Sequence, residues 1–256
     1  MKIKLTILAL ILFVFGFLLF AKANTSSNSE QYNYKLYSPN DISGITQKVV
    51  RTQNDGQIIF IVDFSNSMND YIGSKTKLEM AREVMAEILP RISPNIKVGL
   101  RVYGHRGGFT YLDGCQASKL SVPLGYNNYQ DILESLYTTN AIGWTPITYS
   151  LKQAINKDFA NTAGKKHIIL LTDGGENCDE SPCTYVINLM KTRNDVTIDI
   201  IAFDVKDVEA NNQLRCTALM TSGKFLKAQN QADLTRSLFE TVGISKNVRG
   251  NVKMLE

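Results

Sequence analysis

The stretch "QIIFIVDFSNS", residues 57–67, places Asp63, Ser65 and Ser67 directly after a run of apolar residues. A short unbroken run rich in β-branched residues is typical of a strand that is covered on both faces. The polar residues therefore follow the carboxyl end of a buried strand, which is where open α/β sheets bind their ligands. The stretch predicts a functional site at that end of the sheet.

From residue 56 onward, strand patterns alternate with helix patterns. Helical spacing of apolar residues occurs in 78–89, 132–136, 147–155 and 232–243, and Asn128 is expected to cap the second of these helices. Strand patterns occupy 57–62, 96–104, 119–125, 166–172, 196–205 and 223–228. This alternation predicts an α/β fold with a doubly wound, mostly parallel central sheet and helices on both faces. The runs 96–104 and 119–125 are expected to form a hairpin, which gives the sheet one antiparallel edge strand.

Residues 1–23 have the pattern of a signal peptide. The basic start "MKIK" precedes the apolar run "LTILALILFVFGFLLF", and Ala21-Lys22-Ala23 fits a small-x-small cleavage site. The alternative is an uncleaved membrane anchor, because the apolar run is near the lower length limit for spanning a bilayer. Both interpretations predict an exported chain that is periplasmic, cell-surface or secreted.

The rest of the chain divides into three predicted parts. Residues 24–55 are rich in Asn, Ser and Gln, and we interpret them as a polar spacer with one short strand near 32–37. The folded domain is expected over 56–245, followed by a polar tail over 246–256.

The charge balance argues against nucleic acid as a partner. The chain has 28 basic and 24 acidic residues, a formal net charge of +4. Removal of residues 1–23 takes away Lys2, Lys4 and Lys22, which leaves 25 basic residues against 24 acidic ones. A net charge of +1 is too small to drive binding to a phosphate backbone.

Two aspartates end the two most apolar strand patterns. Asp63 follows "QIIFIV", and Asp173 follows "KHIILLT". If these strands are central and adjacent, their carboxylates meet at the carboxyl edge of the sheet, where they repel unless a cation lies between them. Ser65 and Ser67 add hydroxyl oxygens, and such hard ligands favour Mg²⁺, Ca²⁺ or Mn²⁺ over zinc or copper.

Three motifs together resemble the von Willebrand factor A domains. "DFSNS", residues 63–67, is similar to the D-x-S-x-S motif of that family; "GWTPI", residues 143–147, to its threonine loop; and "LLTDGGEN", residues 170–177, to its T-D-G strand end. The resemblance covers about residues 56–245. Tyr103-Gly104-His105-Arg106 and Leu214-Arg215-Cys216 further resemble exported bacterial members of the family.

The resemblance implies a complete metal-ion-dependent adhesion site. Its ligands would be Asp63, Ser65, Ser67, Thr145 and Asp173; the serines and the threonine would give hydroxyl oxygens, and the acids would bind directly or through water. Mg²⁺ is the expected ion, with Ca²⁺ or Mn²⁺ as alternatives. In such domains one position on the metal stays open, and the implied partner is a protein that fills it with an Asp or Glu carboxylate.

Four cysteines in an exported chain predict two disulfides rather than a zinc site. Pairing of Cys178 with Cys183 closes the shortest loop. The strand order of the family instead makes Cys115 with Cys178 and Cys183 with Cys216 an open alternative.

Four further residues have a structural and a functional interpretation. His105 and His167 are interpreted as structural histidines, with His105 hydrogen-bonded; the alternative for His105 is an approach to the rim of the metal site. Trp144 either packs its loop or presents an aromatic ring to a partner. Glu176 is interpreted as a solvated acid, with a supporting role at the metal site as the alternative.

Binding is favoured over catalysis. A phosphotransferase of the haloacid dehalogenase type would need an acid where Ser65 stands, and the G-x-S-x-G elbow of a serine hydrolase is absent. We therefore expect a metal-dependent protein-binding module and not an enzyme. The first alternative is a scaffold domain with a stabilising ion, and the second is a Mg²⁺-dependent hydrolase or phosphatase.

Overall fold

The computed structural model describes residues 56–108 and 110–243. The predicted leader over 1–23, the spacer over 24–55 with its short strand near 32–37, and the tail over 246–256 lie outside the described residues. Across the described ranges, no helix is both long enough and apolar enough to cross a membrane.

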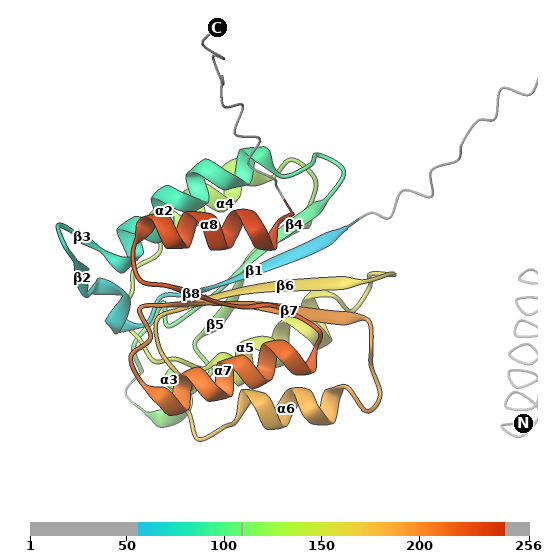
Figure 1. Cartoon of the computed structure of the whole chain (residues 1–256). Coiled ribbons are helices and arrows are strands. Elements are labelled where there is room, and N and C mark those ends of the chain that lie inside the picture. The colour runs from blue at the N-terminus through green and yellow to red at the C-terminus, as the bar shows by residue number, and fades with distance from the viewer. Residues whose placement is uncertain (1–55, 109, 244–256) are drawn as a thin grey trace, which may run out of the picture. The chain divides into compact units, whose positions relative to one another are not determined.

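A six-stranded sheet forms the centre of the domain (Figure 1). Its strand order is β5-β4-β1-β6-β7-β8. The strands are β1 (Gln57–Asp63), β4 (Lys97–Tyr103), β5 (Ser118–Gly125), β6 (Lys166–Thr172), β7 (Val196–Phe203) and β8 (Phe225–Ala228). All neighbours pair in parallel except β4 and β5, which are antiparallel. The prediction of a mostly parallel sheet with one antiparallel edge strand is confirmed.

Helices lie on both faces of this sheet (Figure 1). One face carries α2 (Lys77–Ile88), α4 (Tyr129–Thr138) and α8 (Gln231–Thr241), and the other carries α5 (Ile147–Gln153), α6 (Pro182–Leu189) and α7 (Val208–Met220). A π-helical segment, Ala154–Asp158, extends α5. Each layer has its own apolar core, and the alternating side chains of β1 are divided between the two cores. This arrangement confirms the doubly wound fold.

The strand β1 is buried along its whole length. It lies between β4 and β6, so both of its faces and both of its edges are covered. This environment explains why its sequence is apolar on both faces up to Asp63.

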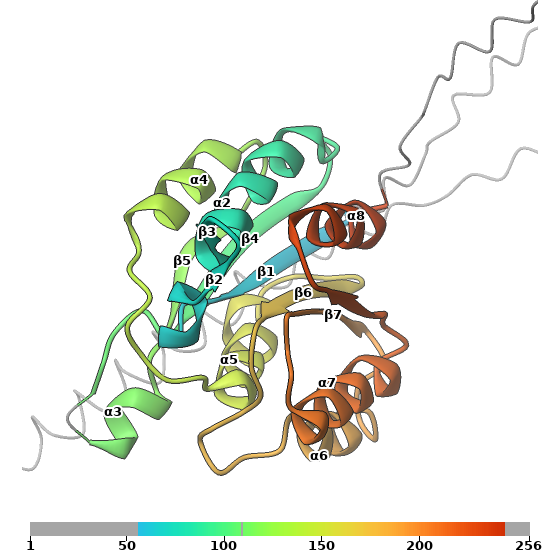
Figure 2. The ribbon, with the colours of Figure 1, turned by 60° about the vertical axis from the view of Figure 1, so that its left-hand side comes forward.

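Several short elements lie at the end of the sheet where β1 ends (Figure 2). A 3-10 turn, Asn66–Asn69, leads into the hairpin of β2 (Tyr71–Ile72) and β3 (Lys75–Thr76). The short helix α3 (Tyr111–Cys115) lies in the connection between β4 and β5. The sequence patterns predicted neither the β2–β3 hairpin nor α3, because both are too short to show a period.

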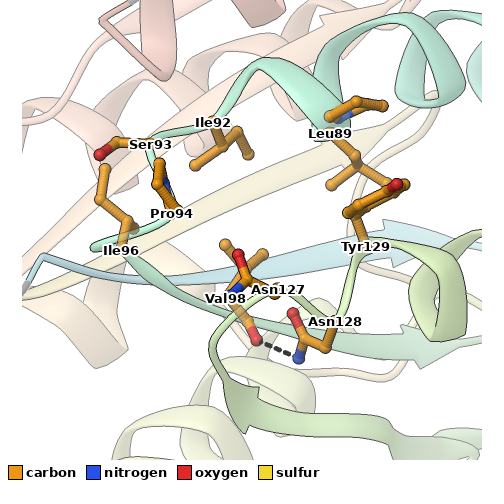
Figure 3. Close-up of a pocket in the computed structure, with 10 residues that line it drawn as sticks. Leu89, Ile92, Ser93, Pro94, Ile96, Val98, Asn127, Asn128 and Tyr129 are labelled. Atoms are coloured by element: carbon orange, nitrogen blue, oxygen red, sulfur yellow. Dashed lines mark hydrogen bonds between the residues drawn. The ribbon is translucent and has the colours of Figure 1, made fainter.

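Asn128 is the N-cap residue of α4, as predicted, but its side chain makes no cap hydrogen bond. Its amide group donates instead to the carbonyl oxygens of Val98, at 2.7 Å, and Pro123, at 3.1 Å. Figure 3 shows the bond to Val98 at the rim of a pocket of about 240 Å³. Since Val98 pairs with Ile58, this pocket lies at the end of β1 opposite to Asp63.

Candidate functional site

Asp63, the last residue of β1, is fully buried and held by three hydrogen bonds. Its Oδ1 accepts from the backbone amide of Ser65 at 2.6 Å, and its Oδ2 accepts from the hydroxyls of Tyr103, at 2.9 Å, and Thr172, at 2.8 Å. Burial and the negative charge of Asp173 raise the pKa of Asp63 from 3.8 to about 6.

The two serines of the D-x-S-x-S motif turn their hydroxyls toward one another. Ser65 is buried and Ser67 partly buried, and their Oγ atoms are 3.1 Å apart. Ser67 also donates a hydrogen bond of 2.8 Å to Oδ1 of Asp173. A chain of polar contacts therefore runs from Asp63 through both serines to the second acid.

Asp173 directly follows β6, and its side chain has 0% exposure. The strands β1 and β6 are neighbours in the sheet, as the sequence predicted for the two most apolar runs. Since the strands are parallel, Asp63 and Asp173 lie at the same edge. Their proximity is reflected in the pKa of Asp63, which the charge of Asp173 helps to raise.

Lys77 is a component of the site that the sequence analysis missed. It is the first residue of α2, and its ammonium group donates to Oδ2 of Asp173 at 2.8 Å. The Lys77 side chain is only 8% exposed. Burial alone would lower the pKa of Lys77. The hydrogen bond to Asp173 and the negative charge of that acid together outweigh burial, so the pKa lies above its ordinary value. No periodic pattern marks a single lysine at a helix start.

The loop with Thr145 reaches the site through backbone contacts. Gly143 forms a β-bridge with Ser65, and its carbonyl oxygen accepts from the amide of Asn66 at 3.1 Å. A Cβ atom at Gly143 would collide with the carbonyl oxygen of Arg106, so this close approach requires glycine. Thr145 is buried, and its amide donates to Oδ1 of Asn177 at 2.8 Å.

The interpretation of Glu176 as a solvated acid is wrong. Its carboxylate is partly buried and accepts from the backbone amides of Thr148, at 2.6 Å, and Cys178, at 3.0 Å. Burial raises the pKa of Glu176 despite these bonds. Thr148 lies in the first turn of α5, whose own cap residue, Pro146, makes no side-chain bond. Glu176 therefore caps α5 from another loop and helps to hold the Thr145 loop in place.

The two histidines differ from one another in their surroundings. His167 lies at the far end of β6 and contacts Asp199 at 3.0 Å, which agrees with a structural role. Nδ1 of His105 is buried and has no hydrogen-bond partner among the described residues, so the expected hydrogen bond is not found at this atom. Burial, with Arg106 and Lys119 nearby, lowers the pKa of His105.

Trp144 packs its loop, as one of its two interpretations expected, and is also partly exposed. Its ring meets the ring of Tyr111 edge to face with centroids 5.6 Å apart, and it lies against Gly114 of α3. Even so, Trp144 is 37% exposed. It packs the loop and presents part of an aromatic surface to solvent beside the site.

One disulfide joins α3 to the loop after β6, and a second joins α6 to α7. Cys115 pairs with Cys178, and Cys183 pairs with Cys216. This is the pairing implied by the family strand order, and the short loop between Cys178 and Cys183 is not closed. The bond from α3 to Cys178 restrains the segment that contains Glu176 and Asn177.

The donor set of the site fits a hard divalent cation. Within residues 56–108 and 110–243, no three His, Cys, Asp or Glu side chains gather into a metal cluster. An ion here would therefore rely on two carboxylates and on hydroxyl oxygens, which suits Mg²⁺, Ca²⁺ or Mn²⁺. Four of the five predicted ligands, Asp63, Ser65, Ser67 and Asp173, share one hydrogen-bonded network. Thr145 stands beside it through the bridge of Gly143 to Ser65.

Comparison with known proteins assigns the class. The von Willebrand factor type A domain family matches residues 57–241, a range that contains every strand of the central sheet. The chain belongs to this family.

Individual relatives agree with that assignment. The uncharacterized protein YwmD of Bacillus subtilis (strain 168) is 30% identical over 190 residues, which cover 71% of this chain and 82% of YwmD. Two solved structures share the fold. Proximal thread matrix protein 1 from the mussel byssus, with a zinc-occupied MIDAS motif, is 22% identical with a TM-score of 0.56, over 74% of this chain and 46% of its own. The pilus adhesin SpaC from Lactobacillus rhamnosus GG is 14% identical with a TM-score of 0.56, over 73% of this chain and 29% of its own.

Proposed function

We propose that the chain is an exported protein-binding module that works through a divalent cation and is not an enzyme. The cation, with Mg²⁺ as the first choice, is held by Asp63, Ser65, Ser67, Thr145 and Asp173. The partner is a protein that offers an Asp or Glu carboxylate to the ion. The observation that carries the proposal is the polar network that links the carboxylates of Asp63 and Asp173 through the backbone amide of Ser65 and the hydroxyls of Ser65 and Ser67.

Family membership and the neighbouring structures support a binding role. Members of the family commonly mediate protein interactions or adhesion, and SpaC is a pilus adhesin. The zinc-occupied motif of the mussel protein is a metal site in the same fold. Two disulfides support export, because disulfides persist in oxidising compartments.

The bound ion supplies a Lewis-acidic position for a carboxylate oxygen. The residues of the chain do the rest: Asp63 and Asp173 provide the negative charge that attracts the ion, and the hydroxyls provide neutral oxygens. Neutral ligands leave positive charge on the ion, which favours the capture of one more anionic oxygen. The surface around the site, which includes Trp144, would select among partners.

Calorimetry of the oxidised chain with Mg²⁺, Ca²⁺ and Mn²⁺ tests the metal site. We expect saturable binding in the wild type and its loss in Asp63→Asn and Ser65→Ala. Folded wild-type protein that binds none of the three ions would contradict the proposal.

Photo-crosslinking to surface proteins of the producing cell tests the partner. Products that form in Mg²⁺, vanish with a chelator and are missing with Asp63→Asn support the binding function. If Mg²⁺ raises the melting temperature but changes no crosslink, the ion only stabilises the fold, and the scaffold alternative takes the place of the proposal.

A further inference from the structure

A buried lysine and the candidate metal site share a single carboxylate. Oδ1 of Asp173 accepts from Ser67, a predicted ligand, and Oδ2 accepts from Lys77. Neither partner of the ion pair is open to solvent, because the Asp173 side chain is 0% exposed and the Lys77 side chain 8%. Asp70 lies 3.6 Å from the same ammonium but is largely exposed.

The location of Lys77 is unfavourable for a cation by ordinary criteria. The N-terminal end of a helix carries a positive partial charge, and Lys77 is the first residue of α2. Burial of an ammonium group adds a desolvation cost that only a close anion offsets. Asp173 is that anion, so the sequence keeps a positive charge beside a site that is expected to bind another.

The position of Lys77 changes the net charge of the site when an ion is bound. Among the buried groups, Asp63 and Asp173 contribute two negative charges when both are ionised, and Lys77 cancels one of them; Asp70 is left out of this sum because solvent screens its exposed charge. A divalent cation then leaves the site with one positive charge. Without the lysine, the same ion would leave it neutral. One partner carboxylate would balance the positive charge that Lys77 preserves.

We propose that Lys77 weakens the binding of the divalent ion and strengthens the capture of a carboxylate by the ion-loaded site. This inference rests on the proposed function. Lys77 acts through Asp173 as a charge-setting residue, and its ammonium stays paired with Asp173 when the ion binds. The ion and the carboxylate therefore bind cooperatively, because each is favoured by the charge that the other brings.

Three substitutions separate charge from packing. Lys77→Gln keeps a hydrogen-bond donor without the charge, Lys77→Met keeps the bulk alone, and Lys77→Arg keeps the charge. Calorimetry should show the Kd for Mg²⁺ falling by about tenfold or more in the Gln and Met variants, because a like charge is removed. The Arg variant should stay close to the wild type.

A control and a second readout distinguish this role from a purely structural one. Lys166 is also buried and paired, with Asp195 at 2.6 Å, at the far end of β6. Lys166→Gln should lower the melting temperature and leave the Kd for Mg²⁺ unchanged. Replacement of chloride by acetate, a probe of carboxylate capture, should tighten Mg²⁺ binding in the wild type more than in Lys77→Gln.

A measurement on the unaltered chain covers the case in which the neutral variants do not fold. Acetylation of Lys77, followed by mass spectrometry, should be low with and without Mg²⁺, while Lys75, with a side chain 42% exposed, reacts in both states. A rise in Lys77 labelling on addition of Mg²⁺ would show that the ion displaces the ammonium and would overturn the proposal.

The outcomes separate this inference from the proposed function. Weaker Mg²⁺ binding in Lys77→Gln, with the wild type still binding, overturns the role of Lys77 alone. Failure of the wild type and of every folded variant to bind Mg²⁺, Ca²⁺ or Mn²⁺ overturns both. Binding by Lys77→Gln but not by the wild type confirms that Lys77 opposes the ion and refutes the metal-dependent function of the natural chain.

Discussion

The carboxylate of Glu176 accepts a hydrogen bond of 2.6 Å from the backbone amide of Thr148, in the first turn of α5. Asn177, the next residue, accepts from the amide of Thr145 at 2.8 Å. The loop after β6 thus provides Asp173 to the site and also holds the loop that brings Thr145. The two halves of the site are fixed to one another by two adjacent side chains.

Replacement of Glu176 by Ala should weaken both the fold and the site. The loss of a helix cap should lower the free energy of unfolding by about 1–2 kcal/mol, measured in urea. The Kd for Mg²⁺ should rise by about tenfold, because the Thr145 loop loses a support. Glu176→Gln keeps one oxygen acceptor, so both the free energy of unfolding and the Kd for Mg²⁺ should change less than in Glu176→Ala.

Glu180 offers a matched control for this experiment. It lies four residues further on, and its exposed carboxylate pairs with Lys152. Exposed pairs contribute little, so Glu180→Ala should change stability by less than about 1 kcal/mol and leave Mg²⁺ binding intact. Equal effects of the two substitutions would refute the capping role of Glu176.

Replacement of Tyr103 by Phe should reveal how strongly its phenol supports Asp63. The substitution removes one buried hydrogen-bond donor and leaves the ring in place. We expect a loss of about 1–2 kcal/mol in the free energy of unfolding at pH 7.5. The loss should shrink at pH 5, where Asp63 is protonated and needs less stabilisation. Tyr137→Phe, at an exposed ring, should have no effect at either pH.

Mg²⁺ binding should depend on pH through Asp63. Its pKa is about 6 in the folded metal-free chain, above the ordinary value of 3.8, so protons compete with the ion below pH 6. Calorimetry should show affinity falling by about tenfold for each further pH unit.

The metal-free fold should respond to pH with the opposite sign. Between pH 3.8 and 6 the folded Asp63 holds more proton than the unfolded one, so its contribution to stability falls as the pH rises through this window. Asp63→Asn should lack this contribution. The difference in melting temperature between the wild type and Asp63→Asn, measured at a series of pH values, therefore isolates the contribution of Asp63. A difference that does not vary with pH would contradict the shifted pKa.

The two disulfides should differ in their effect on the site. Paired Cys→Ser substitutions at either bond should lower stability by about 2–4 kcal/mol in thermal unfolding. Loss of the bond between Cys115 and Cys178 should also weaken Mg²⁺ binding, because Cys178 adjoins Glu176 and Asn177. Loss of the bond between Cys183 and Cys216, which joins α6 to α7, should leave the Kd unchanged. Equal Kd changes for the two bonds would contradict this division.

The sequence predicted the parts of the site that depend on strand order. Asp63 and Asp173 were expected on adjacent central strands because their runs are the most apolar, and β1 and β6 do pair. The positions of Ser65 and Ser67 follow from the short distance along the chain to Asp63. Short distances along the chain and the burial of central strands can both be predicted from the pattern of residues.

The supporting contacts could not be predicted in the same way. Lys77 meets Asp173 across 96 positions, Tyr103 meets Asp63 across 40, and Glu176 meets Thr148 across 28. Each bond depends on the precise separation of two elements, which no period or composition records. Glu176 carried one weak signal, since it lies within three residues of Asp173 in a glycine-rich turn.

The pairing of β1 with β6 also has a consequence for folding. Asp63 and Thr172, which bond directly, are 109 positions apart in the chain. The polypeptide between β1 and β6 must close a long loop before the carboxylates of Asp63 and Asp173 meet, and this closure has an entropic cost. A fragment that lacks β1 or β6 cannot form the site. Any ligand of this site would therefore bind only chains that have completed their sheet, so occupancy would report on the completion of folding.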